Sequence, residues 1–367
     1  MLPLLLSPED SFLSNWKYTH FLFNYAEGFV KRGLVGEILR QTTSNISFTL
    51  VWKLSVLLLT VIYGILFAVF ARPWWRERTN AGLFLFLLIA ITSSATLQHA
   101  VFDLGRFDLL CLLLALGCIA CSGHLSLSTL GSVLLVNSCL LLSLLIHEAA
   151  FFLYVPLVLA FWHMLDPSAR GCRRQLLSAV FLMIATWIIS TRGQMTLNTL
   201  QVHTAQLQAI YGSRVESSAL LVLHRQGIAE NIRLTLDNGF TVARLISHLI
   251  MLLALFPLFK LLWHFYRACR TVLISQQKLL LLSSFSPLAL YPLGYDHFRW
   301  WALALTNLFI VLSLLMTWYP PVRTRIAAAI MQHKTLVWLT IASSLLFGPL
   351  AVTESFDFLL WYSTYPH

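Results

Sequence analysis

Long apolar stretches alternate with short polar joins along most of the chain. A helix needs about 20 predominantly apolar residues to cross a hydrocarbon core of roughly 30 Å, and about ten segments approach that length. The expected spans are residues 48–71, 80–98, 107–123, 128–146, 149–165, 175–191, 242–264, 277–294, 301–318 and 335–352. The pattern predicts an all-α, polytopic membrane bundle of about ten transmembrane helices.

Two segments fall outside this pattern. Residues 1–47 contain apolar residues but no run long enough to span, so they are expected to be external. We consider three arrangements. The segment is translocated without a span of its own, it forms a re-entrant or interfacial helix between residues 12 and 40, or a first span is missing. Residues 192–241 have the apolar spacing of two amphipathic helices and are expected to form a long external loop. Such helices would recognise a ligand as a lid or simply cover the bundle. With no repeat or linker, residues 1–367 are expected to form one membrane domain.

Composition excludes a soluble protein. Hydrophobic residues make up 58% of the 367 residues and charged residues only 11%, against roughly 25% in soluble domains. The net charge of +10 therefore reports on membrane orientation, and no nucleic-acid partner is expected. Four basic loops, which the positive-inside rule assigns to the cytoplasm, fall on one face: residues 72–78, 166–174, 266–270 and 320–325. We expect a multi-pass protein of the cell inner membrane.

Ionisable residues gather at three joins on the opposite face, which is periplasmic or external. These joins contain Asp103, Arg106, Asp108, His147, Glu148, Asp296, His297 and Arg299. Such residues at membrane depth are candidates for function. The alternative is that each one caps a helix or anchors it at the interface.

The segment FNYAEGFVKRGLVGEILR at 23–40 adds Glu27, Lys31 and Arg32 to the candidates. On a helix, Glu27 and Lys31 would face each other because they are four residues apart. The segment is interpreted either as an amphipathic interfacial helix or as a catalytic loop, and the two are compatible.

The residue types favour transfer of a group from a lipid-phosphate carrier. A carboxylate accepts the proton of an acceptor hydroxyl, and arginine binds phosphate oxygens. We therefore expect the catalytic residues to be among Asp103, Asp108, Glu27, Glu148 and Asp296. The substrate-binding candidates are Arg106, Arg299, His147, His297, Lys31 and Arg32. No metal site or cofactor is assigned, although a divalent metal stays open. The cysteines are expected to be small buried hydrophobes rather than disulfide or zinc ligands.

The layout resembles bacterial integral-membrane glycosyltransferases of the GT-C type and the polymerases of O-antigen and exopolysaccharide assembly. The resemblance rests on Glu27 in YAEGFVKRG, on Asp103 and Asp108 in DLGRFD, and on the segments YDHFRWW and LIHEAAF. It implies transfer of a sugar from a polyprenyl-phosphate-type carrier to a glycan acceptor on the non-cytoplasmic face. The alternatives are a secondary transporter and a non-catalytic subunit of a polysaccharide assembly system. No oligomeric state is predicted.

Overall fold

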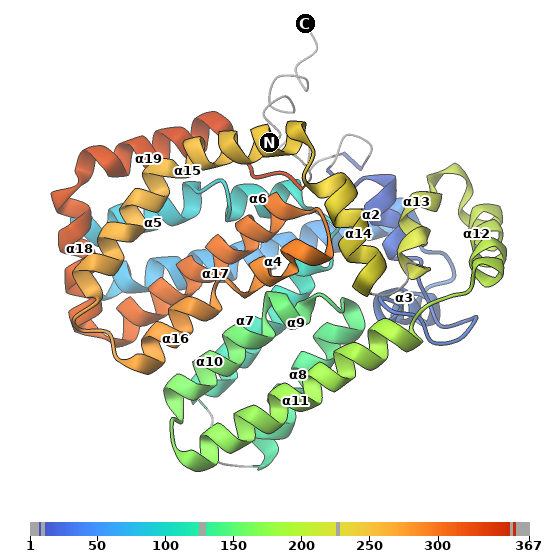
Figure 1. The fold of residues 1–367 in the computed structure, drawn as a ribbon, viewed down its shortest axis with the longest axis horizontal. Helices are drawn as coiled ribbons and strands as arrows, with labels where there is room; N and C mark the ends of the chain where they lie inside the picture. The colour runs from blue at the N-terminus through green and yellow to red at the C-terminus, as the bar shows by residue number, and fades with distance from the viewer. Residues whose placement is uncertain (1–6, 9–11, 125–129, 225–227, 353–354, 357–367) are drawn as a thin grey trace, which may run out of the picture. The chain divides into compact units, whose positions relative to one another are not determined.

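The computed structural model describes residues 7–8, 12–124, 130–224, 228–352 and 355–356 (Figure 1). These residues are helical apart from turns, loops and one isolated bridge between Leu350 and Phe356. Contacts divide the chain into two compact units. The first unit comprises residues 1–62 and 103–231, and the second comprises residues 63–102 and 232–367. The expectation of one membrane domain over residues 1–367 stays a prediction.

The first unit is built around four apolar helices that pack against one another. They are α7 (Asp108–His124), α8 (Leu130–Ile146), α10 (Val155–Leu165) and α11 (Ala169–Arg192). Shorter elements connect or cover them: α2 (Asn15–His20), α3 (Leu34–Thr42), α9 (Ala150–Leu153), α12 (Leu197–Tyr211), η1 (Gly212–Arg214), α13 (Ser217–Leu220) and η2 (Leu221–Leu223). The 29-residue helix α4 (Phe48–Arg76) begins in this unit and ends in the second one.

The N-terminal segment is folded into the first unit. Helix α2 packs against α13, and the Thr19 hydroxyl accepts a hydrogen bond from the Glu216 backbone N–H at 2.9 Å. Leu22 and Phe23 are fully buried. Residues 21–33 form turns, so the helix considered for residues 23–40 is wrong over its first half, and only α3 remains helical. Residues 1–6 and 9–11 of the segment lie outside the described residues.

The second unit surrounds one buried helix, α17 (His297–Trp318). In the most apolar stretch of α17, 94% of the residues are buried. The helix packs against α18 (Pro320–Gln332), α16 (Ser275–Ser283) and η3 (Ser286–Leu293). Helix α15 (Val242–Cys269) runs along α18 and α19 (Lys334–Phe347), as Figure 1 shows. The remaining helices are α5 (Ala81–Thr92), α6 (Leu97–Phe102) and α14 (Ile228–Gly239).

Five helical stretches, rather than ten, are long and apolar enough to cross a membrane among the described residues. They are Phe48–Arg76, Ala81–Phe102, Ala169–Arg192, Val242–Cys269 and His297–Trp318. Four shorter apolar helices occupy other predicted spans: Asp108–Gly123, Leu130–Ile146, Ala150–Leu165 and Lys334–Phe347. The length and composition of the five stretches support a multi-pass membrane protein.

The span expected at residues 277–294 is replaced by two short elements. Helix α16 ends at Ser283, and residues 286–293 form the 3-10 helix η3. Pro287 and Pro292 lie in η3, and proline lacks the N–H that an α-helix interior needs. The run is apolar enough to span, and the α-helix ends four residues before the first of its two prolines.

The long loop expected at residues 192–241 is helical, as predicted, and part of it is core. Ala219, Leu220 and Leu223 are fully buried, and the Met195 N–H donates to the Leu223 carbonyl at 3.0 Å. Residues 217–223 therefore help to build the first unit, beyond covering it. Residues 225–227 lie outside the described residues.

Candidate functional site

A tight turn at residues 103–106 places two charged side chains together in the first unit. The Arg106 N–H donates to the Asp103 carbonyl at 3.1 Å, and Gly105 has a φ of +88°. The positive φ favours glycine at this position, and a Cβ on Gly105 would lie 2.3 Å from the Leu13 Cδ1 atom, so the Leu13 side chain would have to move. The DLGR sequence thus folds into a turn that holds Asp103 and Arg106 beside each other.

Asp103 and Arg106 form a buried ion pair. The Arg106 Nε atom lies 2.8 Å from Asp103 Oδ1, and the two side chains are 14% and 2% exposed. The Arg106 guanidinium also lies over the Trp16 ring, 4.8 Å from its centroid. This cation–π contact joins the turn to α2.

A second ion pair connects the N-terminal segment to the join between α8 and α9. Arg32 donates from Nε to Glu148 Oε2 at 2.9 Å and from Nη2 to Oε1 at 2.6 Å. Arg32 adopts a φ of +63°, which is uncommon for a residue with a Cβ. Its neighbour Lys31 donates its backbone N–H to the Gly193 carbonyl at the end of α11, at 3.0 Å. The loop is therefore held at Arg32 by its side chain and at Lys31 by its backbone.

His147 links the second ion pair to the start of α7. Its Nε2 atom lies 3.7 Å from Asp108 Oδ1, and its Nδ1 atom lies 3.4 Å from Glu148 Oε2. The Ala149 N–H also donates to Nδ1, at 3.3 Å. Asp108 is the first residue of α7, where a carboxylate interacts favourably with the helix dipole. Asp108 and His147 are both buried.

His20 lies between these groups and was not a candidate from the sequence. Its ring is tilted by 52° against the Trp16 ring, with centroids 4.0 Å apart, and meets Phe107 edge-on. The positive charges of Arg32 and Arg106 both act on it. The spacing of Trp16 and His20, four residues apart on one short helix, was the available signal. We call His20, Arg32, Asp103, Arg106, Asp108, His147 and Glu148 the polar cluster.

Burial and the two arginines set the charge states in the polar cluster. Burial raises the pKa of Glu148, but the charge of Arg32 and its hydrogen bonds to the carboxylate outweigh burial, so the pKa lies well below its usual range. Burial and Arg32 lower the pKa of His147. The same two causes lower the pKa of His20 well below its usual value. At neutral pH the cluster therefore holds an ionised glutamate beside two neutral histidines.

The remaining predicted residues lie elsewhere. Glu27 is on an exposed turn, where its charge raises the pKa of His203 on α12 against the larger lowering effect of burial. Lys31 is buried next to Arg32. The third join belongs to the second unit, where Asp296 and Arg299 pair at 2.5 Å. Its residues His297 and Arg299 lie in the first turn of α17, although the sequence placed them before a span.

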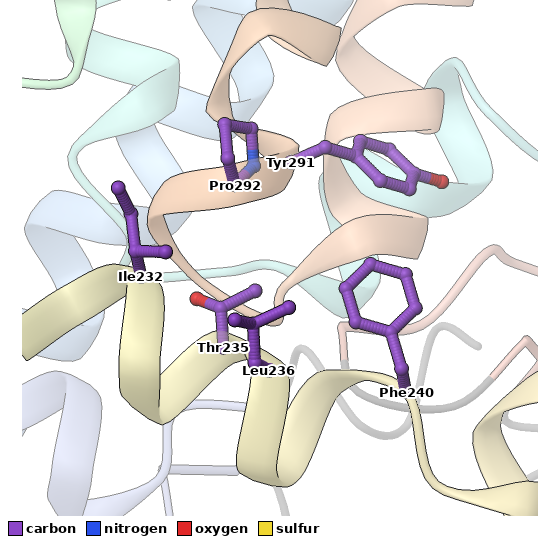
Figure 2. Close-up of a pocket in the computed structure, with 6 residues that line it drawn as sticks. All are labelled: Ile232, Thr235, Leu236, Phe240, Tyr291 and Pro292. Atoms are coloured by element: carbon purple, nitrogen blue, oxygen red, sulfur yellow. The ribbon is translucent and has the colours of Figure 1, made fainter. Parts of the chain in front are cut away.

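His297 belongs to an aromatic group in the second unit. Its ring stacks on Tyr291 with centroids 4.3 Å apart and lies 5.4 Å from Phe240. Tyr291 and Phe240 also line a cavity of about 300 Å³, together with Ile232, Thr235, Leu236 and Pro292. Figure 2 shows the three α14 side chains across from η3, with the two rings on one side. The walls are almost entirely apolar, which suits a hydrocarbon ligand better than a sugar.

Comparison with known proteins adds no family to this geometry. No family model, curated protein or solved structure matches the chain. Among the described residues, no group of three or more His, Cys, Asp or Glu side chains is arranged to hold a metal ion.

Proposed function

We propose that the protein is a membrane-embedded glycosyltransferase or polysaccharide polymerase. It transfers a sugar from a polyprenyl-phosphate-type carrier to a glycan acceptor, with the polar cluster as its active site. The cluster faces the non-cytoplasmic side of the inner membrane, as the basic loops on the other face indicate.

One observation carries the proposal: segments far apart in the sequence bring their ionised side chains together in a buried site. Residues 20–32, 103–108 and 147–148 supply the polar cluster within the first unit. Burying an ion costs several kcal/mol after relaxation, and a buried pair is weak evidence for stability. Ionisable groups at the ends of apolar helices are expected to have a function.

The arginines are suited to bind the phosphate. The side chains of Arg32 and Arg106 are 15% and 14% exposed, whereas those of Asp103 and Asp108 are 2% exposed. Together with Glu148, whose side chain is 16% exposed, the arginines are thus the more accessible members of the two ion pairs, and each guanidinium has five N–H donors, of which its carboxylate uses only some. Planar guanidinium groups bind phosphate oxygens through two parallel hydrogen bonds.

Asp103 is the proposed base because it lies beside Arg106. The acceptor hydroxyl gives its proton to the Asp103 carboxylate while its oxygen bonds to the anomeric carbon of the sugar. The bond from that carbon to the phosphate oxygen breaks, and the carrier phosphate leaves with the electron pair. Arg106 stabilises the negative charge of the leaving phosphate. The ion pair of Arg32 and Glu148 fixes the N-terminal loop to the join between α8 and α9, and Asp108 lies beside His147.

The test is turnover of polyprenyl-phosphate sugars by the purified, monodisperse protein. Asp103→Asn keeps the size of the side chain but removes the base, a role worth roughly 10² to 10⁴ in rate. Arg106→Lys keeps the charge but removes the planar fork and should lower turnover as well. The chain offers a matched control pair, Arg233 and Asp237, whose side chains are 77% and 63% exposed. Asp237→Asn and Arg233→Lys should leave turnover unchanged.

Two results would contradict the proposal in different ways. Full activity of Asp103→Asn would remove that residue as the base and leave Asp108 or Glu148 as candidates. A wild-type protein that moves the intact lipid-linked sugar across vesicles without cleaving the sugar–phosphate bond would be a transporter.

A further inference from the structure

His20 has one imidazole nitrogen that no described residue engages. Its Nδ1 atom lies 2.9 Å from the Trp16 carbonyl oxygen, one helical turn earlier. A carbonyl oxygen only accepts hydrogen bonds, so Nδ1 carries the proton of the neutral ring. The Nε2 atom then carries the lone pair. It is buried and has no hydrogen-bond partner among the described residues, in a residue that is 6% exposed.

A buried acceptor without a partner is costly, at about 1–3 kcal/mol. In the other histidine of the polar cluster both ring nitrogens lie near polar groups. The Nδ1 atom of His147 accepts a hydrogen bond from the Ala149 N–H at 3.3 Å, and its Nε2 atom lies 3.7 Å from Asp108 Oδ1. His20 differs because aromatic rings, those of Trp16, Phe23 and Phe107, surround it. These rings hold the imidazole in place without occupying Nε2.

We infer that His20 Nε2 accepts a hydrogen bond from a hydroxyl of the sugar that the polar cluster binds. The inference rests on the proposed function and deepens it. A lone pair selects a donor, so a phosphate oxygen does not fit this position, whereas a sugar hydroxyl does. Arg32 and Arg106 act on the same ring from nearby and are suited to the phosphate. The complementary ligand therefore carries a hydroxyl close to a phosphate, as the sugar of a polyprenyl-phosphate donor does.

The neutral state of His20 keeps the acceptor available. Burial is the main cause of its lowered pKa, and Arg32, Arg106 and His147 add to it, against an opposing contribution from the Trp16 carbonyl. His20 is thus a substrate-binding residue, because it contacts the sugar while the proton of the reaction goes to a carboxylate. Its loss should weaken recognition of one hydroxyl while the base stays in place.

Two substitutions separate the two ring nitrogens. In His20→Asn the side-chain amide reaches the Nδ1 position and keeps a donor for the Trp16 carbonyl, but no atom replaces Nε2. In His20→Gln the amide reaches the Nε2 position and offers an acceptor there. With a series of polyprenyl-phosphate hexoses, His20→Asn should lower kcat/KM by roughly 5- to 150-fold, the equivalent of 1–3 kcal/mol. His20→Gln should recover most of this loss.

Deoxy substrates identify the hydroxyl. For one of the monodeoxy analogues of the hexose, the kcat/KM of the wild type should fall by the same factor as the kcat/KM for the parent hexose falls in His20→Asn. With His20→Asn, removal of that hydroxyl should cause no further fall. Wild-type activity of His20→Asn would overturn the inference and leave the proposed function intact. Equal further losses for every analogue on His20→Asn would also overturn it, because they indicate a purely structural role. A wild type that turns over no member of the series would refute the proposed function and the inference with it.

A measurement on the unmodified chain covers the case in which His20→Asn fails to fold. In ¹⁵N-histidine-labelled protein, the Nε2 resonance of His20, assigned by its loss in His20→Gln, should move upfield when the hexose donor saturates the site. An Nε2 resonance that stays in place at saturation would overturn the inference.

Discussion

The pair of Arg32 and Glu148 allows a sharp test of what a buried ion pair contributes to stability. Arg32 donates two hydrogen bonds to Glu148, at 2.9 and 2.6 Å, and the side chains are 15% and 16% exposed. Glu148→Gln keeps the shape but leaves the guanidinium without its carboxylate. Removing one member of a fully buried pair costs roughly 3–5 kcal/mol. Since both side chains keep some access to solvent, we expect Glu148→Gln to lower the free energy of unfolding by about 2–3 kcal/mol.

The double variant Arg32→Met with Glu148→Gln separates the lost pair from the stranded charge. Replacing both charges leaves no ion unpaired, and such replacements are often neutral. Methionine has a Cβ like arginine, so the φ of +63° at position 32 costs the same in both chains. We therefore expect the double variant to unfold within about 1 kcal/mol of the wild type, closer than Glu148→Gln does.

Equilibrium unfolding by SDS in mixed micelles, followed by tryptophan fluorescence, measures these differences. Asp237→Asn, which breaks an exposed pair, is the control and should show no measurable change. A Glu148→Gln variant that unfolds within about 1 kcal/mol of the wild type would contradict this prediction. So would a double variant whose loss equals the sum of the losses of Glu148→Gln and of Arg32→Met alone, because the two charges would then act independently.

Three further outcomes are expected. Gly105→Ala should destabilise the protein by about 1–3 kcal/mol through strain and a clash, whereas Gly64→Ala, which meets no neighbour within 4 Å, should not. The pKa of Glu148 is lower in the folded protein than the value of about 4.3 in an unfolded chain. The ionised carboxylate therefore stabilises the fold at pH values above about 4.3. Unfolding should therefore show a loss of stability below about pH 5 that Glu148→Gln lacks. In a cysteine-free background, a cysteine at Thr324 should react with a membrane-impermeant maleimide only from the cytoplasm and one at Ser213 only from outside; the reverse pattern would refute the topology.

Apolar composition predicted where helices lie better than how long they are. The runs at 48–71, 175–191 and 242–264 all fall inside long helices of the structure. Hydropathy measures the preference of residues for an apolar medium, and it does not report whether a helix continues. Pro287 and Pro292 in η3 interrupt runs that hydropathy joins. The long helices were therefore predictable. The breaks depend on the backbone chemistry of single residues, which hydropathy averaged over a run does not report.

The candidate site was predictable in part for a similar reason. Asp103, Arg106 and Glu148 stood out because ionised residues are rare beside apolar spans. Their membership of one cluster with Arg32 depends on the path of residues 21–33, which turns at Gly28 and Arg32, both with positive φ. A helix, the simplest expectation there, would have pointed Arg32 elsewhere. His20 stayed hidden because nothing in a sequence reveals that a nitrogen lacks a partner.

The interleaving of the two units has a consequence for how the chain is made. Helix α5 packs against α18 and α19, yet α5 ends at Thr92 and α18 begins at Pro320. At a synthesis rate of roughly 5–20 residues per second, α5 waits on the order of 10–45 s for its neighbours, while most of the first unit is being made. A nascent chain stopped before residue 320 therefore leaves α5 without its principal packing partners. The second unit therefore completes the packing around α5 only near the end of translation, once α18 and α19 have been made.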